Sequence, residues 1–112
     1  MIQIQYNREN MVLLILGHAG YAEKGRDIVC AAVTALAGTL EKCIQERGEG
    51  SCEWKEGETC FTAAGTENLR PCFETVVTGL SMLAEEFPEY IEFKETSSTA
   101  CGGPPSPNGE GS

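Results

Sequence analysis

The chain has 112 residues, 41% of them apolar and 22% charged, and its net charge is −9 at pH 7. This length predicts one domain, and the ordinary composition excludes collagen-like, coiled-coil and wholly disordered proteins. The few basic residues are scattered singly. Binding to a phosphate backbone needs clustered Lys and Arg, so no direct nucleic-acid binding is expected. The acidic surface either attracts a basic partner or only maintains solubility.

The sequence indicates neither a membrane segment nor a secretory signal. The longest apolar run, residues 11–16, has six residues, whereas a helix needs about 20 to cross a bilayer. The first ten residues, MIQIQYNREN, lack the basic start and apolar core of a signal peptide. We therefore expect a soluble, cytoplasmic protein without a membrane partner.

Six cysteines raise the question of disulfides and metals. An even count in a short secreted chain would suggest disulfides, but a cytosolic compartment keeps thiols reduced. No two cysteines have the close spacing of a zinc or redox motif, and only one histidine could assist. Most cysteines are therefore interpreted as small buried apolar residues, and neither a metal nor a cofactor is expected. The cysteines are Cys30, Cys43, Cys52, Cys60, Cys72 and Cys101.

Two strands are predicted first. Ile2, Ile4 and Tyr6 alternate with polar neighbours, which is typical of a half-buried strand. A turn follows at residues 7–10. The continuous Val/Leu/Ile run at 11–16 is long enough for a central strand and too short for a helix. A loop is expected over residues 20–27.

A long helix is predicted from Asp27 to about Arg47, because Asp is a preferred N-cap and no proline follows. Its buried face is expected to present apolar residues at near four-residue spacing, namely Ile28, Ala32, Leu36, Leu40 and Ile44. A strip of small residues would allow a sheet or helix to approach closely: Ala31, Ala35 and Gly38. A dimer surface is expected on residues off the apolar face: Val33, Thr34 and Ala37.

The remaining elements are a hairpin, a second helix and a last strand. Residues 51–55 and 58–63 flank Glu56 and Gly57, a hairpin pattern. The second helix begins between Asn68 and Pro71, since proline is tolerated only in a first turn, and Pro88 ends it. A strand follows near residues 90–93. The sequence thus predicts a two-layer α+β fold of order ββαββαβ, with a mixed or antiparallel sheet and two main helices.

These elements divide the chain into two parts. Residues 1–95 form one domain. Residues 96–112 are rich in Gly, Pro and Ser and contain almost no apolar side chains. Such a segment cannot offset its ordering entropy, so it is expected to be a disordered tail.

Three residues suggest chemistry. His18, the single histidine, directly follows the central strand, and Asp27 and Cys30 open the first helix. Helix N-termini and a nearby imidazolium lower the pKa of a thiol, which makes the thiolate nucleophile available. If the segment between His18 and Cys30 folds back, the two side chains form the thiol–imidazole pair of a cysteine enzyme. The alternative is a buried structural cysteine and an ordinary loop histidine.

A family resemblance bears on this choice. Residues 17–19 (GHA) and 25–34 (GRDIVCAAVT) are similar to the signature of the ribosomal-processing cysteine protease family (Prp), including the His-to-Cys interval. The element order resembles the family across residues 1–95. The resemblance implies a bacterial, cytoplasmic endopeptidase that removes the N-terminal extension of large-subunit ribosomal protein twenty-seven. It also implies a homodimer and a hydrolase of the thiol protease class, acting in ribosome biogenesis.

Carried over to this sequence, the resemblance makes Cys30 the nucleophile and His18 the general base that later protonates the leaving amine. Asp27 caps the helix or orients His18, as the third member of a triad does. Thr34 lies one turn beyond Cys30 on the same face, where the family often has Ser. First-turn N–H groups, including that of Cys30, are candidate oxyanion donors. Gly20 and Gly25 bracket a loop that could order on substrate as a hinged lid.

Two other functions stay open. The chain could be a non-catalytic partner that binds a basic ribosomal protein or a ribosome assembly factor through its acidic surface. Cys30 could also serve as a redox-sensing thiol. Cleavage of an extended ribosomal-protein peptide distinguishes the protease from both.

Overall fold

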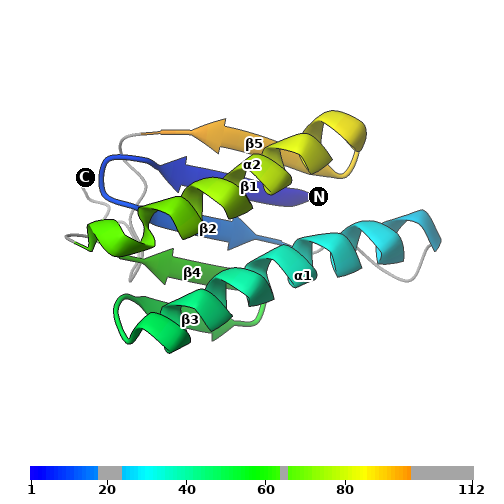
Figure 1. Cartoon of the computed structure of the whole chain (residues 1–112). Coiled ribbons are helices and arrows are strands. Elements are labelled where there is room, and N and C mark those ends of the chain that lie inside the picture. The colour runs from blue at the N-terminus through cyan, green and yellow to red at the C-terminus, as the bar shows by residue number, and fades with distance from the viewer. Residues whose placement is uncertain (18–23, 64–65, 97–112) are drawn as a thin grey trace, which may run out of the picture.

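A single mixed sheet with two helices on one face makes up the fold (Figure 1). The structure is a computed structural model of the whole chain, and it describes residues 1–17, 24–63 and 66–96, with only the backbone at 24–27. The strands are β1 (Ile2–Asn7), β2 (Val12–Leu16), β3 (Ser51–Lys55), β4 (Glu58–Thr62) and β5 (Ile91–Glu95). The helices are α1 (Lys24–Arg47) and α2 (Arg70–Glu86), with a 3₁₀ turn, η1 (Glu67–Leu69), before α2.

The sheet order is β3-β4-β2-β1-β5, which puts β2 at the centre as predicted. The β1–β5 pair is parallel, and the other three pairs are antiparallel. The parallel pair requires the chain to cross over between β4 and β5, and α2 makes that crossover. The predicted α+β fold and its ββαββαβ order are confirmed. The predicted tail, residues 96–112, lies outside the described residues except for Thr96.

The start of α1 corrects the sequence analysis. The helix begins at Lys24, so residues 24–27 are helical rather than part of a loop. Asp27 is the fourth residue of the helix and lies in its first turn, so its predicted role as N-cap is wrong. A glycine such as Gly25 costs a helix only about 1 kcal/mol, which the packing of the following turns overrides.

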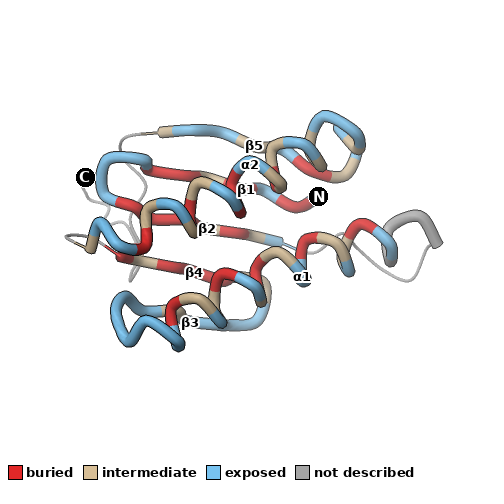
Figure 2. Tube along the Cα trace, in the orientation of Figure 1, coloured by how far each residue is buried: buried red, intermediate tan, exposed pale blue. Residues whose placement is uncertain are grey.

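The buried face of α1 is also rotated from the prediction. Val29 replaces Ile28, whose side chain is 67% exposed, and Ala32 and Leu36 are only half-buried. Apolar residues occupy every position from Ile28 to Val33, so periodicity alone does not identify the buried face. The buried residues face the sheet and α2 (Figure 2), and in α1 they are Val29, Val33, Ala37, Leu40 and Ile44.

Two further expectations for α1 are wrong for the same reason. Val33 and Ala37 are buried in the core of the subunit, so they are not available as a dimer surface. The predicted strip of small residues does not mediate close packing, because Ala31 and Ala35 are exposed. The close approach instead occurs at Gly79 of α2, where a Cβ atom would lie 3.1 Å from Cδ1 of Leu36.

The length of α1 has a second consequence. Its segment Ile28–Arg47 is long and apolar enough to cross a membrane by length and composition, which the six-residue limit on apolar runs did not anticipate. Core helices of soluble proteins pass the same test. Leu40 and Ile44 pack in the hydrophobic core, which is how a core helix uses its apolar face.

The cysteines are less buried than expected. Cys30, Cys43, Cys52 and Cys72 are free and only half-buried. Cys60 is buried in β4 and is disulfide-bonded, which departs from the expectation of reduced thiols. Cys101 lies outside the described residues.

A polar network fastens the carboxyl end of β1 to α2 and β5. The buried hydroxyl of Tyr6 donates to Oε2 of Glu74 at 3.0 Å. The Arg8 guanidinium donates to Glu74 and to Glu95, the latter at 2.8 Å. Arg70 donates to the backbone carbonyl of Arg8 at 3.0 Å. Burial first, and the bond to Glu74 second, raise the pKa of Tyr6 to about 12.

Replacing Tyr6 with Phe removes one buried hydrogen bond and should lower the free energy of unfolding at pH 8 by about 1 kcal/mol. A raised pKa in the folded state stabilises the fold below the ordinary tyrosine pKa of about 10. That contribution is lost as the pH rises through about 12. The difference between wild type and Tyr6→Phe in urea unfolding should therefore shrink from pH 8 to pH 11. An equal difference at both pH values would contradict this account.

Candidate active site

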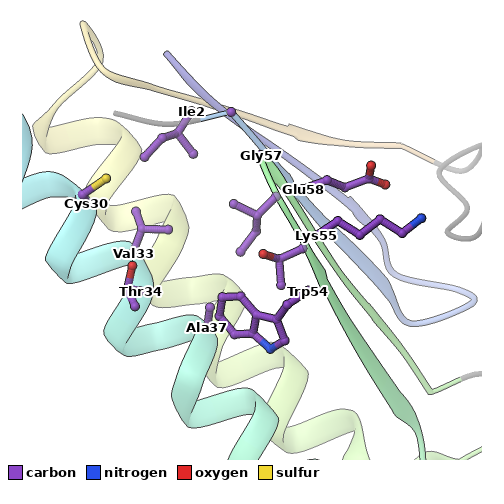
Figure 3. A pocket seen from close by; sticks show the side chains of 12 residues that line it. Ile2, Cys30, Val33, Thr34, Ala37, Trp54, Lys55, Gly57 and Glu58 are labelled. Carbon is purple, nitrogen blue, oxygen red and sulfur yellow. The ribbon is translucent and has the colours of Figure 1, made fainter. Parts of the chain in front are cut away.

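An open pocket of about 190 Å³ lies between α1 and the strands of the sheet. Figure 3 shows α1 side chains on one side and hairpin side chains on the other. The lining residues are Ile2, Ile15, Gly17, Cys30, Val33, Thr34, Ala37, Trp54, Lys55, Gly57, Glu58 and Thr59. The pocket therefore combines a free thiol with apolar walls and a polar rim.

The α1 wall is one helical stripe. Cys30, Val33, Thr34 and Ala37 follow the spacing i, i+3, i+4, i+7, which places them on a common face. The buried positions Val33 and Ala37 fix the rotation of the helix, and that rotation brings the half-buried Cys30 thiol and the Thr34 side chain to the pocket. The prediction that Cys30 and Thr34 share a face is confirmed.

The position of Cys30 within α1 corrects one candidate role. Cys30 is the seventh residue of a helix that begins at Lys24. Only the first four N–H groups of an α-helix lack an intrahelical acceptor, and Cys30 lies beyond them. The Cys30 N–H belongs to the helical hydrogen-bond ladder, so it is not the free oxyanion donor that the sequence suggested.

Gly17 ends β2 at the pocket with a backbone that only glycine readily adopts. Its φ is +87°, and a Cβ atom would lie 2.6 Å from the carbonyl oxygen of Met1. Its N–H donates to the carbonyl of Gly57 at 2.8 Å, which joins the end of β2 to the turn of the β3–β4 hairpin. His18 is the next residue, so Gly17 sets where the chain leaves the sheet toward the predicted general base.

The other predicted site residues have limited structural description. His18 and Gly20 lie outside the described residues. Asp27 and Gly25 are placed by their backbone only, in the first turn of α1. The structure brings Cys30, Thr34 and the residue preceding His18 to one pocket.

The hairpin wall was not anticipated from the sequence. The hairpin itself was predicted, but no site role was assigned to it. Trp54 lies at the pocket with 46% of its surface exposed, and its ring meets Phe61 edge to face at a centroid distance of 6.2 Å. Lys55 and Glu58 bring one charge of each sign to the same wall. The sequence offered one signal, a tryptophan in a short predicted strand. The pairing of β4 with β2 brings this hairpin beside the central strand and so makes it a wall of the pocket.

This arrangement can hold a peptide against a nucleophile. A pocket with apolar walls receives side chains, and charged groups at its rim orient a polar backbone. Within residues 1–17, 24–63 and 66–96, no group of three or more His, Cys, Asp or Glu side chains could hold a metal ion. The chemistry available in the described part of the pocket is that of the Cys30 thiol.

Solved structures of other proteins share this fold. SMU.848 from Streptococcus mutans matches with a TM-score of 0.70 and 27% identity, covering 86% of this chain and 94% of that one. The ribosomal processing protease Prp of S. aureus, in complex with a substrate peptide, matches with a TM-score of 0.70. Its identity is 21%, with 85% of this chain and 97% of that chain covered.

Two sequence comparisons identify the family. The family model described as "Cysteine protease Prp" matches residues 1–92, so the chain belongs to that family and is a cysteine protease. The ribosomal processing cysteine protease Prp of Mycoplasma genitalium is 29% identical over 99 residues, covering 84% of this chain and 97% of the relative. The resemblance stated from residues 17–34 is confirmed at the level of the family.

Gly17→Ala should reduce both stability and peptide cleavage. A left-handed backbone costs a residue with a Cβ atom about 1–2 kcal/mol, and the contact with the Met1 carbonyl adds to this cost. Gly48→Ala is the matched control, because Gly48 has φ +71° but no atom within 4 Å of its Cβ position. Urea unfolding and peptide cleavage measure the two effects. Equal losses of stability in the two variants, with cleavage intact in Gly17→Ala, would contradict the role of Gly17 in positioning the pocket.

Proposed function

We propose that this cysteine protease is an endopeptidase that removes the N-terminal extension of large-subunit ribosomal protein twenty-seven. The observation that carries the proposal is the free thiol of Cys30 in an open pocket. The wall of that pocket also includes Gly17, the residue directly before His18. A thiol and an imidazole held together form a nucleophile and its base.

In the proposed reaction His18 accepts the thiol proton of Cys30, and the sulfur attacks the carbonyl carbon of the scissile bond. The C–N bond then breaks, and His18 gives the proton to the leaving amine. Water, activated by His18, hydrolyses the thioester and restores the thiol. Thr34 would offer a hydroxyl to the bound peptide. The reaction needs neither a metal nor a cofactor.

Asp27 has two proposed contributions. A carboxylate in the first turn of a helix interacts favourably with the positive end of the helix dipole. The same carboxylate would orient the His18 imidazole, as the third member of a triad does. A lid hinged at Gly20 and Gly25 stays a hypothesis, now with Gly25 in the first turn of α1.

The charge of the chain supports a basic substrate. A net charge of −9 favours the approach of a positively charged protein such as a ribosomal protein precursor. The M. genitalium relative is named a ribosomal processing protease, and the S. aureus protein was solved with a substrate peptide. A direct contact with nucleic acid is not part of the proposal, because the acidic surface repels phosphates.

The cellular context is proposed along with the substrate. A protease that processes a ribosomal protein would act in the bacterial cytoplasm and contribute to ribosome biogenesis. A homodimer is proposed without an assigned surface, since two of the three residues expected there are buried. Sedimentation at micromolar concentration tests this, and a monomeric mass would contradict the dimer. Residues 96–112 are proposed as a tail that contributes nothing to cleavage.

Cys30→Ser should abolish cleavage of the N-terminally extended ribosomal protein, because a hydroxyl is essentially never ionised at neutral pH. We expect the rate to fall by several orders of magnitude, with the fold stable to within about 1 kcal/mol for this conservative change. His18→Ala should lower the rate comparably. The double variant should be hardly slower than either single one, since the two groups act as a unit. Product masses and rates are measured by mass spectrometry.

The controls separate the mechanism from folding. Cys52→Ser replaces another half-buried free thiol and should leave the rate unchanged. Asp27→Asn keeps the side-chain shape, so a loss of rate with an unchanged melting temperature assigns Asp27 to positioning His18. Full cleavage by Cys30→Ser would overturn the thiol mechanism. Binding of the extended protein without any cleavage by the wild type would favour a non-catalytic partner.

A further inference from the structure

The sheet has a second face, and the centre of that face is apolar. Successive side chains of a strand point to opposite faces, and Leu13 and Ile15 of β2 belong to the hydrophobic core beneath the helices. Val12, Leu14 and Leu16 therefore point to the second face. A continuous apolar run is typical of a strand that is buried on both faces. Since α1 and α2 lie on the same side of the sheet (Figure 1), the second face needs a different cover.

The burial of two side chains indicates that such a cover exists. Val12 is 7% exposed and Cys60 of β4 is 4% exposed, yet neither belongs to the core cluster that packs against the helices. The next residue, Phe61, does belong to it, so Cys60 points to the second face, where it pairs with Leu14. Among residues 1–17, 24–63 and 66–96, the strands all lie in the sheet, and both helices and η1 pack together on its other side. None of these elements covers Val12 and Cys60.

The bonding of the cysteines identifies the segment that supplies the cover. Cys60 is disulfide-bonded, and the chain has six cysteines. The four cysteines that are free are Cys30, Cys43, Cys52 and Cys72. Within one chain, the partner that remains for Cys60 is Cys101, which follows β5 in the sequence.

The distance across the sheet fits this pair. One row of paired residues crosses from β5 through β1 and β2 to β4, namely Lys94, Gln5, Leu14 and Cys60. Strands are about 4.8 Å apart, so the row spans about 14 Å. Thr96 lies two residues beyond Lys94, and its N–H donates to the Tyr6 carbonyl at 2.8 Å, which holds the chain beside β1. From Thr96 to Cys101 the extended chain reaches about 17 Å, and a disulfide joins Cα atoms about 5.5 Å apart. The chain after β5 is therefore long enough to reach Cys60.

We propose that Cys60 and Cys101 form a disulfide that straps residues 97–101 across the second face of the sheet. The strap would run from β5 over β1 and β2 to β4, and it would cover Val12 and Leu14. Its side chains before Cys101 are small, which suits close packing on a pleated surface; the sequence is Ser97, Ser98, Thr99 and Ala100. The predicted disorder of the tail would then apply only beyond Cys101.

The disulfide forms by exchange with a small disulfide such as oxidised glutathione. One thiolate of the pair attacks that disulfide, and one small thiol leaves. The second thiolate attacks the protein sulfur of the mixed disulfide, the protein S–S bond forms, and a second small thiol leaves. The two protein thiols lose two electrons and two protons, which the small disulfide takes up as it becomes two thiols. At 4% exposure Cys60 is shielded from attack by reductants, so the bond persists where exposed thiols stay reduced.

The test equilibrates the full-length protein with reduced and oxidised glutathione, then blocks remaining thiols with iodoacetamide. Digestion after glutamate places Cys60 in residues 59–67 and Cys101 in residues 96–110, with every other cysteine in a separate peptide. We expect these two peptides to be joined, at about 2 Da below the sum of their masses. The undigested protein should have the mass of one chain. If Cys60 is alkylated, or is joined to another cysteine or to a second copy of the chain, the proposal is wrong.

Matched variants test the stabilisation. Cys101→Ser should lower the melting temperature by several degrees, because the bond closes a loop of about 40 residues and so restricts the unfolded chain. A phosphine reductant should lower the melting temperature of the wild type and leave that of Cys101→Ser unchanged. Cys43→Ser removes a thiol that is free and half-buried, so it should keep the bond and the reductant-sensitive melting temperature. Equal melting temperatures of oxidised wild type and Cys101→Ser would contradict the strap.

Proteolysis tests where the strap lies. Proteinase K should trim the oxidised wild type back to about Cys101 and leave residues 97–100 intact, whereas it should trim Cys101→Ser back to about Thr96. Peptide cleavage by the two proteins should be equal, because the pocket with Cys30 lies on the helix side of the sheet. The outcome is thus independent of the proposed substrate. Equal trimming of the two proteins would overturn the proposal.

Discussion

The pocket depends on how the chain leaves the central strand at Gly17. A Cβ atom built on this residue would lie 2.6 Å from the Met1 carbonyl oxygen, and the Gly17 N–H donates to the carbonyl of Gly57. One glycine thus joins the amino terminus, the central strand and the hairpin turn. A side chain here would push these three segments apart. It would also shift the point from which the chain continues to His18.

The second constraint is the rotation of α1. Val29, Val33 and Ala37 are buried against the sheet and α2, and their burial turns Cys30 and Thr34 toward the pocket. The apolar area that these side chains remove from water stabilises the fold by about 25 cal/mol per Å². The same packing that stabilises the domain therefore orients the thiol of Cys30, the proposed nucleophile. A catalytic thiol on a loop would lack this support.

The sequence predicted the strands well, because alternation in β1 and a turn at Glu56 and Gly57 are local signals. It pointed to Cys30 through the pattern of His18, Asp27 and a cysteine near a helix start, and then through a family signature; the structure places Cys30 at a pocket. It failed at the rotation of α1, since residues 28–33 are apolar without a break and both Ile28 and Val29 fit a buried face. It also failed at Trp54, because a hairpin becomes a pocket wall only through the strand order β3-β4-β2. Such long-range pairings leave no mark in a single sequence.

We propose that a peptide substrate binds in the pocket between Cys30 and Trp54. Trp54 is the single tryptophan of the chain and is 46% exposed at the pocket, so its fluorescence reports on that pocket without interference. The measurement titrates full-length Cys30→Ser with the extended ribosomal-protein peptide, and a peptide without the extension is the control. The account predicts a saturable blue shift with the extended peptide only, as Trp54 is covered. Calorimetric binding of the extended peptide with unchanged Trp54 emission would contradict it.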